Sequence, residues 1–142
     1  MQGFGRFGLH LGLLQQILDD LEGCFRPAGV GDLRQGKVTL PVLYALTVDH
    51  PRRGELDELL RGGRLSREPE QALEIIEAAG AREYVVWAAL EERKRARQAL
   101  ELPAPNSEWA RAGRDALESF LLLAFNGLPE LAGPELHGGP RA

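Results

Sequence analysis

Cysteine is almost absent from this sequence, because Cys24 is the only one among 142 residues. A single thiol excludes an internal disulfide and a zinc site built from several cysteines, and it suits a reducing cytoplasm. No apolar run approaches the roughly 18 residues of a transmembrane helix, and the N-terminal residues lack the apolar segment of a signal peptide. We therefore expect a cytoplasmic chain with no membrane span.

An excess of basic charge is also lacking. The sequence has 17 Lys and Arg residues against 21 Asp and Glu, which gives a net charge of −4. Proteins that bind nucleic acids usually carry a basic stripe, so we expect no nucleic-acid partner. The 44% of hydrophobic residues and 27% of charged residues are typical of a globular domain. No alternating strand pattern of useful length and no internal repeat occur, so the expected fold class is all-α.

Apolar residues recur at steps of three and four along most of the chain, which predicts helices. Several helix ends carry a signal: Gly23 ends the first helix, Pro41 opens the second, and Gly80 stands where a glycine ends a helix. The fourth helix is capped by Ser66 or Glu68 and the last by Asn106 or Ser107. The predicted helices cover residues 7–22, 41–48, 54–61, 66–79, 81–101 and 107–126.

Two segments are predicted to lie outside regular structure. Residues 23–36 contain several glycines and a proline and are predicted to form a loop. Residues 128–142 are rich in Pro and Gly, which predicts a flexible tail. The expected organisation is one helical domain over residues 1–127, followed by this tail.

The first predicted helix is apolar over most of its circumference, yet it carries Asp19 and Asp20. Two adjacent carboxylates are costly to bury as anions unless a cation or a basic partner compensates them. Gln16 lies one helical turn before Asp20, on the same face. A magnesium ion takes few protein ligands and keeps waters and phosphate oxygens, so this pair could hold one. For the two aspartates alone, a solvated helix end is the better interpretation.

Lys37 is one of two lysines in the chain and follows a glycine shortly before the predicted helix at Pro41. A lysine beside a helix N-terminus can bind a diphosphate as a point charge. A solvated surface lysine is the alternative. Other chemistries find less support: the glycine spacing of residues 3–8 fits a dinucleotide-binding pattern but lacks the preceding strand, and the three histidines are widely separated.

These residues together resemble the trans-type polyprenyl (isoprenyl) diphosphate synthases. The segment Leu11-Gly-Leu-Leu-Gln-Gln-Ile-Leu-Asp-Asp20 is similar to the second aspartate-rich motif of that family, Leu-Gly-x-Ala-Phe-Gln-Ile-x-Asp-Asp. The segment Gly31-Asp-Leu-Arg-Gln-Gly-Lys-Val-Thr-Leu-Pro41 resembles its Asp-Leu-x-x-Gly-Lys-x-Thr-Leu-Pro motif, in the same order and at a similar separation. The resemblance covers most of residues 7–105.

The resemblance implies a helical bundle like the C-terminal half of the isoprenoid synthase fold. It also implies magnesium-dependent transfer of a prenyl group from an allylic diphosphate to isopentenyl diphosphate. By position, Asp19 and Asp20 would be metal ligands, Gln16 would line the allylic site and Lys37 would bind the allylic diphosphate. Arg26 stands where many members have the lysine of a Gly-Lys-Pro turn.

Several departures from the family pattern bear on activity. Gly23 replaces the third aspartate of the Asp-Asp-x-x-Asp pattern, which some members also lack. The N-terminal half, with the first aspartate-rich motif and the isopentenyl site, is missing. We therefore expect a half or subunit that is active only with a partner, either another copy of itself or a separately encoded N-terminal half. A non-catalytic interaction or regulatory partner, or a degenerate relic of such an enzyme, is the alternative, and a truncated reading frame is a third. Product chain length and the final prenyl acceptor stay open.

Overall fold

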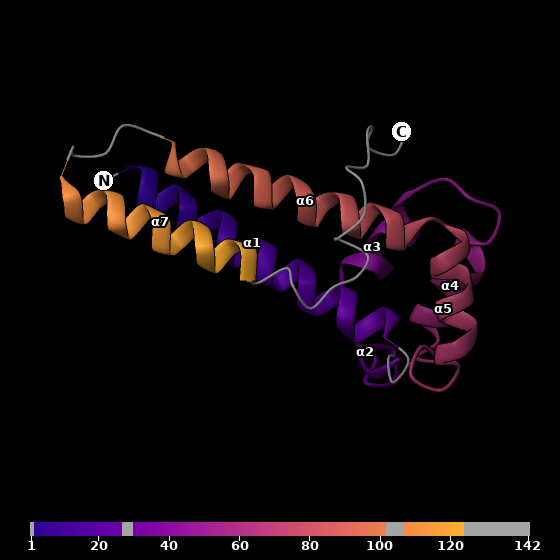
Figure 1. Ribbon diagram of the computed structural model, residues 1–142. Coiled ribbons are helices and arrows are strands. Elements are labelled where there is room, and N and C mark those ends of the chain that lie inside the picture. Colours follow the sequence, from indigo (N-terminus) through magenta and orange to yellow (C-terminus); the bar gives the residue numbers. More distant parts are fainter. Residues whose placement is uncertain (1, 27–29, 102–106, 124–142) are drawn as a thin grey trace. The chain divides into compact units, whose positions relative to one another are not determined.

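The computed structural model describes residues 2–26, 30–101 and 107–123 (Figure 1). Within these ranges the chain forms seven helices and no strand, so the expected all-α class is confirmed. None of the helices in the described part of the chain has the length and apolar character needed to cross a membrane. The helices are α1 (Gln2–Phe25), α2 (Gly31–Arg34), α3 (Leu40–Thr47), α4 (Arg53–Arg61), α5 (Pro69–Ala78), α6 (Ala81–Leu100) and α7 (Glu108–Leu123).

The chain divides into two compact units, and the division falls inside α1 and inside α6. Among the described residues, the first unit contains residues 2–16, 88–101 and 107–123. The second contains residues 17–26 and 30–87, and it includes the whole of α2, α3, α4 and α5.

The first unit has a small core and one buried acidic side chain. Its buried apolar residues are Phe7, Leu14, Ala89, Ala96, Ala99, Leu100 and Leu121. The carboxylate of Glu92 is buried with them and has two partners: His10 Nδ1 lies 2.7 Å from it, and Arg95 donates to it at 2.6 Å. A buried carboxylate with such partners avoids most of the cost of an unpaired buried charge. Glu92 therefore links α6 to α1.

The second unit contains the larger core. Its fully buried residues come from the end of α1, from α2 to α5 and from the start of α6: Cys24, Leu33, Val42, Ala45, Leu56, Leu59, Leu65, Ala72, Ile75, Ile76 and Ala81. Helix α3 packs against α4 and α5, and α2 packs against α5. Each buried Leu or Ile side chain contributes about 1.5–3 kcal/mol by leaving water, so this core is the main source of stability of the unit.

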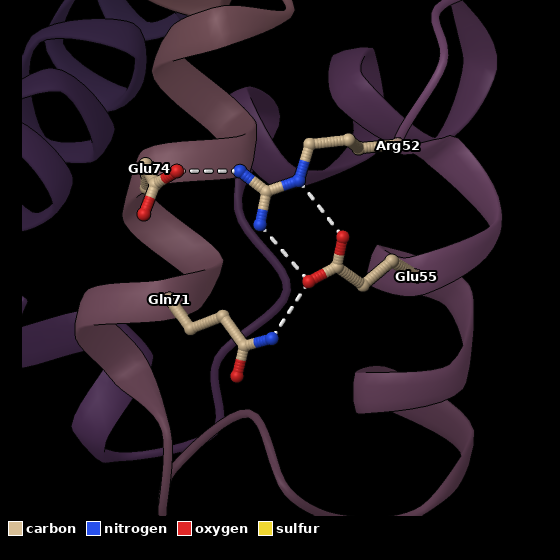
Figure 2. A network of polar contacts seen from close by, with 4 residues as sticks. All are labelled: Arg52, Glu55, Gln71 and Glu74. Atoms are coloured by element: carbon tan, nitrogen blue, oxygen red, sulfur yellow. Dashed lines mark hydrogen bonds and ion pairs between the residues drawn. The ribbon is translucent and has the colours of Figure 1, made fainter.

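A polar network joins α4 to α5 at the surface of this unit (Figure 2). Arg52 donates through Nε and Nη2 to the two carboxylate oxygens of Glu55, at 2.8 and 2.9 Å, and through Nη1 to Glu74 at 2.6 Å. Gln71 donates to Glu55 at 2.7 Å. These hydrogen bonds hold the pKa of Glu55 at about 2, below its ordinary 4.5, and they raise the pKa of Arg52. The arginine thus fixes the start of α4 against α5.

Three of the six predicted helices, those over 41–48, 54–61 and 81–101, match α3, α4 and α6 to within one residue at each end, but the region after Asp20 differs. Helix α1 continues through Gly23 to Phe25, so the predicted stop at Gly23 is wrong. The predicted loop over residues 23–36 contains the short helix α2. Gly80, with a φ of 80°, ends the fifth helix as expected. The cap at Ser107 is confirmed, because its hydroxyl accepts the N–H of Ala110 at 3.1 Å. The tail over 128–142 lies outside the described residues.

Candidate functional site

Asp20 contacts the second motif directly. Its Oδ2 atom accepts a hydrogen bond from the backbone N–H of Leu40, the first residue of α3, at 2.9 Å. A carboxylate at this place satisfies a helix N–H that has no partner within the helix and interacts favourably with the positive end of the helix dipole. Asp20 is half-buried, whereas Asp19 is exposed. The second aspartate therefore joins α1 to the start of α3.

The Gly36-Lys37 pair forms the turn that ends α2. Gly36 has a φ of 68°, in the left-handed region that favours glycine. Its N–H donates to the carbonyl of Leu33, and the N–H of Lys37 donates to the carbonyl of Asp32, both at 2.9 Å. This pair of bonds is a Schellman motif. The turn brings Lys37 back over Asp32, and Lys37 Nζ lies 3.1 Å from Asp32 Oδ1.

Asp32 also lies against α1. A Cβ atom added to Gly23 would come within 2.6 Å of Asp32 Cγ and still closer to Asp32 Oδ2. Two carbons in contact are separated by about 3.5–4.0 Å, so Gly23 has no room for a side chain while Asp32 stays in place. The two motifs therefore meet at two points, Asp20 with Leu40 and Gly23 with Asp32.

Thr39 is buried beside this junction without a hydrogen-bond partner. It precedes α3 as its N-cap residue, but its side chain makes no capping bond. Thr39 is only 9% exposed, and its hydroxyl oxygen has no partner in the described part of the chain. Buried hydroxyls are normally hydrogen-bonded, so this one has an unused capacity to bind a ligand or a water.

Cys24 lies next to Gly23 in sequence and is fully buried. Burial, followed by the negative charge of Asp32, raises the pKa of its thiol to about 12. The thiolate is the reactive form of cysteine, so this thiol is unsuited to act as a nucleophile or a metal ligand at neutral pH.

The remaining predicted site residues are placed as follows. Gln16 is exposed and belongs to the first compact unit, whereas Asp19, Asp20, Arg26 and Lys37 belong to the second. Arg26 is exposed and pairs with Glu22 one turn earlier in α1, at 2.9 Å. The structure therefore joins Asp20 to the start of α3 and Lys37 to Asp32 of α2, but gives no contact of Gln16 or Arg26 with either motif residue. Their roles stay predictions.

Two residues of this region were not predicted from the sequence. Asp32 stands in the Asp-Leu-x-x-Gly-Lys segment that carries the resemblance, so its place in that motif was the available signal. Thr39 belongs to the same motif and precedes Leu40 and Pro41, where a threonine is a common helix N-cap residue. Sequence spacing does not predict that Asp32 contacts Lys37, and it does not predict that the Thr39 hydroxyl is buried without a hydrogen-bond partner.

Comparison with known proteins finds similarity to polyprenyl diphosphate synthases. It is 36% identical over 118 residues to the all-trans-nonaprenyl-diphosphate synthase (geranyl-diphosphate specific) of Rhodobacter capsulatus, covering 75% of this chain and 34% of the relative. It is 31% identical over 118 residues to the octaprenyl diphosphate synthase of Escherichia coli, covering 78% of this chain and 36% of the relative.

A third relative aligns over fewer residues but with a higher sequence identity. Over 47 residues, which are 28% of this chain and 13% of the relative, the chain is 51% identical to heptaprenyl diphosphate synthase component 2 of Bacillus subtilis. No family model and no solved structure matches the chain.

The chain is therefore a homologue of the polyprenyl diphosphate synthases, and the resemblance inferred from the two motifs is confirmed. It spans about a third of the length of the curated relatives it matches, as a partial, C-terminal-like segment.

Proposed function

We propose that this chain provides one half or subunit of a magnesium-dependent polyprenyl diphosphate synthase. In this role it takes part in transferring a prenyl group from an allylic diphosphate to isopentenyl diphosphate. The observation that carries the proposal is the hydrogen bond between Asp20 and the N-terminal amide of α3. This bond joins Asp20 to the first residue of α3, three residues after Lys37, and so supports a diphosphate site that draws on both motifs.

The acidic residues fit magnesium only as part of a diphosphate complex. In the described ranges no group of three or more His, Cys, Asp or Glu side chains could hold a metal ion. Magnesium, however, is commonly bound by one or two carboxylates together with substrate phosphates and waters. Asp19 and Asp20 can supply those carboxylates, because a carboxylate accepts several bonds and Asp20 uses one oxygen on Leu40.

Different residues of this region would contact the diphosphate and the magnesium ion. The N-terminus of α3 is largely occupied, because Asp20 accepts the N–H of Leu40 and Pro41 has no N–H to offer. Lys37 is therefore the cationic contact for the diphosphate. Two residues later, Thr39 has a buried hydroxyl that has no hydrogen-bond partner among the described residues. Asp19 and Asp20 hold the metal side of the complex. When bound, magnesium supplies Lewis-acid assistance to the departing diphosphate.

A partner is part of this proposal. One relative is named as component 2 of its synthase, which implies a further component in that protein. In the first compact unit of this chain, Leu9 is 61% exposed and Trp109 is 89% exposed, and Phe4, Leu13, Phe120, Leu122 and Leu123 are also exposed. These exposed side chains on α1 and α7 are the residues that we propose contact the partner.

The alternative is a non-catalytic interaction partner or a relic of such an enzyme. It is favoured by the same exposed apolar side chains and by the absence, within the described ranges, of a group of three metal-binding side chains. In this case the helices would be retained for association, and Asp20 would serve only to cap α3.

Capture of a tagged chain from its native lysate separates these two functions. The eluate is assayed for incorporation of isopentenyl diphosphate in the presence and absence of magnesium. Magnesium-dependent incorporation together with a co-eluting protein that carries an upstream aspartate-rich motif supports a catalytic subunit. A co-eluting protein without any incorporation, both before and after addition of allylic diphosphate, supports the non-catalytic partner.

Association itself is testable on the purified chain. We expect light scattering to give a mass above 15.6 kDa for the wild type. The double variant Leu9→Glu/Leu13→Glu should shift the chain towards the monomer, because two charges replace exposed apolar side chains on α1. Gln98→Glu, at an exposed position of α6, is the matched control and should leave the mass unchanged. A monomeric wild type would contradict the proposed association.

A further inference from the structure

The outward side of α1 in the first compact unit carries three glycines. Gly5, Gly8 and Gly12 are exposed and are spaced by three and four residues, so they share one face of the helix, here called the glycine face. A Cβ atom added at any of them would meet no described atom within 4 Å beyond the neighbouring turns of α1. Because a glycine inside a helix costs about 1 kcal/mol relative to alanine, this face is unfavourable in the isolated chain.

Helix α7 carries a second uncovered side, here called the tryptophan face. Trp109, Phe120 and Leu123 are 89%, 53% and 67% exposed, and their spacing places them on one side of the helix. The residues between them on this side are small and exposed: Ala112, Gly113 and Ala116. The other side of α7 is packed through Leu121, which is buried. The tryptophan face therefore projects large side chains near its two ends and has room at its middle.

The two faces are complementary in size. Along α1, the exposed glycines Gly5 and Gly8 are followed by Leu9 and Leu13, which are 61% and 42% exposed. Along α7, a large side chain comes first and the small residues follow. When the two helices run in the same direction, Trp109 therefore lies over the space beside the glycines, and the leucines lie over the small residues. Both faces are exposed in the single chain, so they do not cover each other.

Their charges are complementary as well. Arg6 is the only Lys, Arg, Asp or Glu among residues 2–16, and it is exposed. Glu108 is exposed at the start of α7, and neither side chain forms an ion pair with another described residue. Both lie within the first two turns of their helices, and α1 and α7 run in the same direction (Figure 1). When α1 lies parallel to α7 of a second molecule, Arg6 and Glu108 are therefore near each other.

We propose that the glycine face of α1 binds the tryptophan face of α7 in a second copy of this chain, and that the reverse contact completes a two-fold symmetric dimer. The inference rests on the proposed function, because it names the partner for the association described there. Each copy carries both faces, so a single two-fold rotation covers all four of them. Parallel pairing of like faces would instead bring two copies of Arg6 or two copies of Glu108 together.

Exchange of the two charges tests this pairing on the full chain. The variants are Arg6→Glu and Glu108→Arg, each studied alone and in an equimolar mixture, with Lys94→Glu at an exposed position of α6 as the matched control. Sedimentation equilibrium gives the mass and the dissociation constant, and circular dichroism checks that the helix content is unchanged. We expect the wild type to have twice the mass of the 15.6 kDa chain.

Each charge variant alone should dimerise at least tenfold more weakly than the wild type, because its dimer contains two like-charge contacts. The equimolar mixture should regain most of the affinity of the wild type, because each contact in a mixed dimer again joins opposite charges. Lys94→Glu should dimerise like the wild type.

A second variant acts on shape alone. Gly8→Leu/Gly12→Leu replaces two helix glycines at positions where a side chain has room in the single chain. We expect a higher thermal midpoint at concentrations where the chain is monomeric, because leucine favours the helix more than glycine does. Dimerisation should be at least tenfold weaker, because the added side chains occupy the space that Trp109 needs. A glycine face without a partner would give the higher midpoint and unchanged dimerisation.

The contradicting results separate this inference from the proposed function. If the wild type associates but the mixture of charge variants does not recover its affinity, the inference is overturned while the proposed association stands. A charge variant or a glycine variant that dimerises as tightly as the wild type overturns the inference in the same way. A monomeric wild type contradicts both, and its flotation with phosphatidylcholine vesicles would assign the two faces to a lipid surface. Pyrophosphate binding in magnesium tests the diphosphate site independently of these results.

Discussion

Replacing Asp20 separates its structural role from its proposed role in metal binding. Thr39, the N-cap residue of α3, makes no side-chain cap, and Asp20 instead accepts the N–H of Leu40 at 2.9 Å from another helix. Loss of a helix-capping acceptor costs about 1 kcal/mol, and loss of a negative charge at a helix N-terminus costs about 0.3–1 kcal/mol. Asp20→Ala should therefore lower the free energy of unfolding by about 1–2 kcal/mol.

Asp20→Asn should behave differently, because its amide oxygen can still accept the N–H of Leu40. Only the charge is lost, so we expect a decrease of about 0.3–1 kcal/mol. Asp19→Asn serves as the neighbouring control, since Asp19 is exposed and most such changes stay within about 0.5 kcal/mol. Denaturation in urea, followed by circular dichroism at the helix band, measures all three.

The binding measurement should then rank the variants differently from the stability measurement. Asp19→Asn and Asp20→Asn should both weaken magnesium-dependent pyrophosphate binding, although neither is strongly destabilised. If Asp20→Ala has the same free energy of unfolding as the wild type, the bond between Asp20 and Leu40 does not contribute to stability. If Asp20→Asn is as destabilised as Asp20→Ala, the argument that the amide oxygen preserves the bond is refuted.

Further predictions concern the network of Figure 2, the buried thiol and the unpaired hydroxyl. The pKa of Glu55 lies at about 2, below its ordinary 4.5, so its contribution to stability is fully present above pH 4.5 and is lost as the pH falls towards 2. Arg52→Met should flatten the pH dependence of the thermal midpoint in that window; an unchanged profile would count against the network. The thiol of Cys24 has a pKa raised to about 12 by burial, so it should react with a thiol reagent at pH 8 only after denaturation; rapid labelling of the native chain would contradict its burial. Thr39→Val should raise the free energy of unfolding of the unliganded chain by roughly 1 kcal/mol, because it removes an unsatisfied hydroxyl. The same variant should weaken pyrophosphate binding in magnesium. A loss of stability would show that the hydroxyl has a partner in solution.

The helices were predictable where a local signal coincided with apolar periodicity. Gly80 ended the fifth helix because a left-handed residue at that place favours glycine, and Ser107 capped the last helix through its own hydroxyl. Pro41 marked the start of α3 correctly, although it is the second residue of that helix. Such signals act within a few residues, so the sequence alone is sufficient to find them.

The region around Gly23 was not predictable in this way. A glycine ends many helices, but here it stays inside α1 because Asp32 packs against it from a helix that follows later in the chain. Helix α2 was missed because its four residues are too few to show a period, and only the Schellman motif at Gly36 marks it. The Asp20–Leu40 bond joins residues twenty positions apart, which spacing rules for single helices do not reach. The sequence motifs identified the residues of this region, but which of them contact one another depends on tertiary packing.

The most direct test of the central claim is calorimetric titration of inorganic pyrophosphate into the wild-type chain and into the Asp19→Asn/Asp20→Asn variant, with magnesium and with EDTA. The account predicts binding by the wild type that requires magnesium, and its loss in the variant while the helix content stays unchanged. Equal binding by the two proteins in magnesium, or no binding by the wild type in either buffer, would contradict the assignment of a magnesium diphosphate site to the junction of α1 and α3.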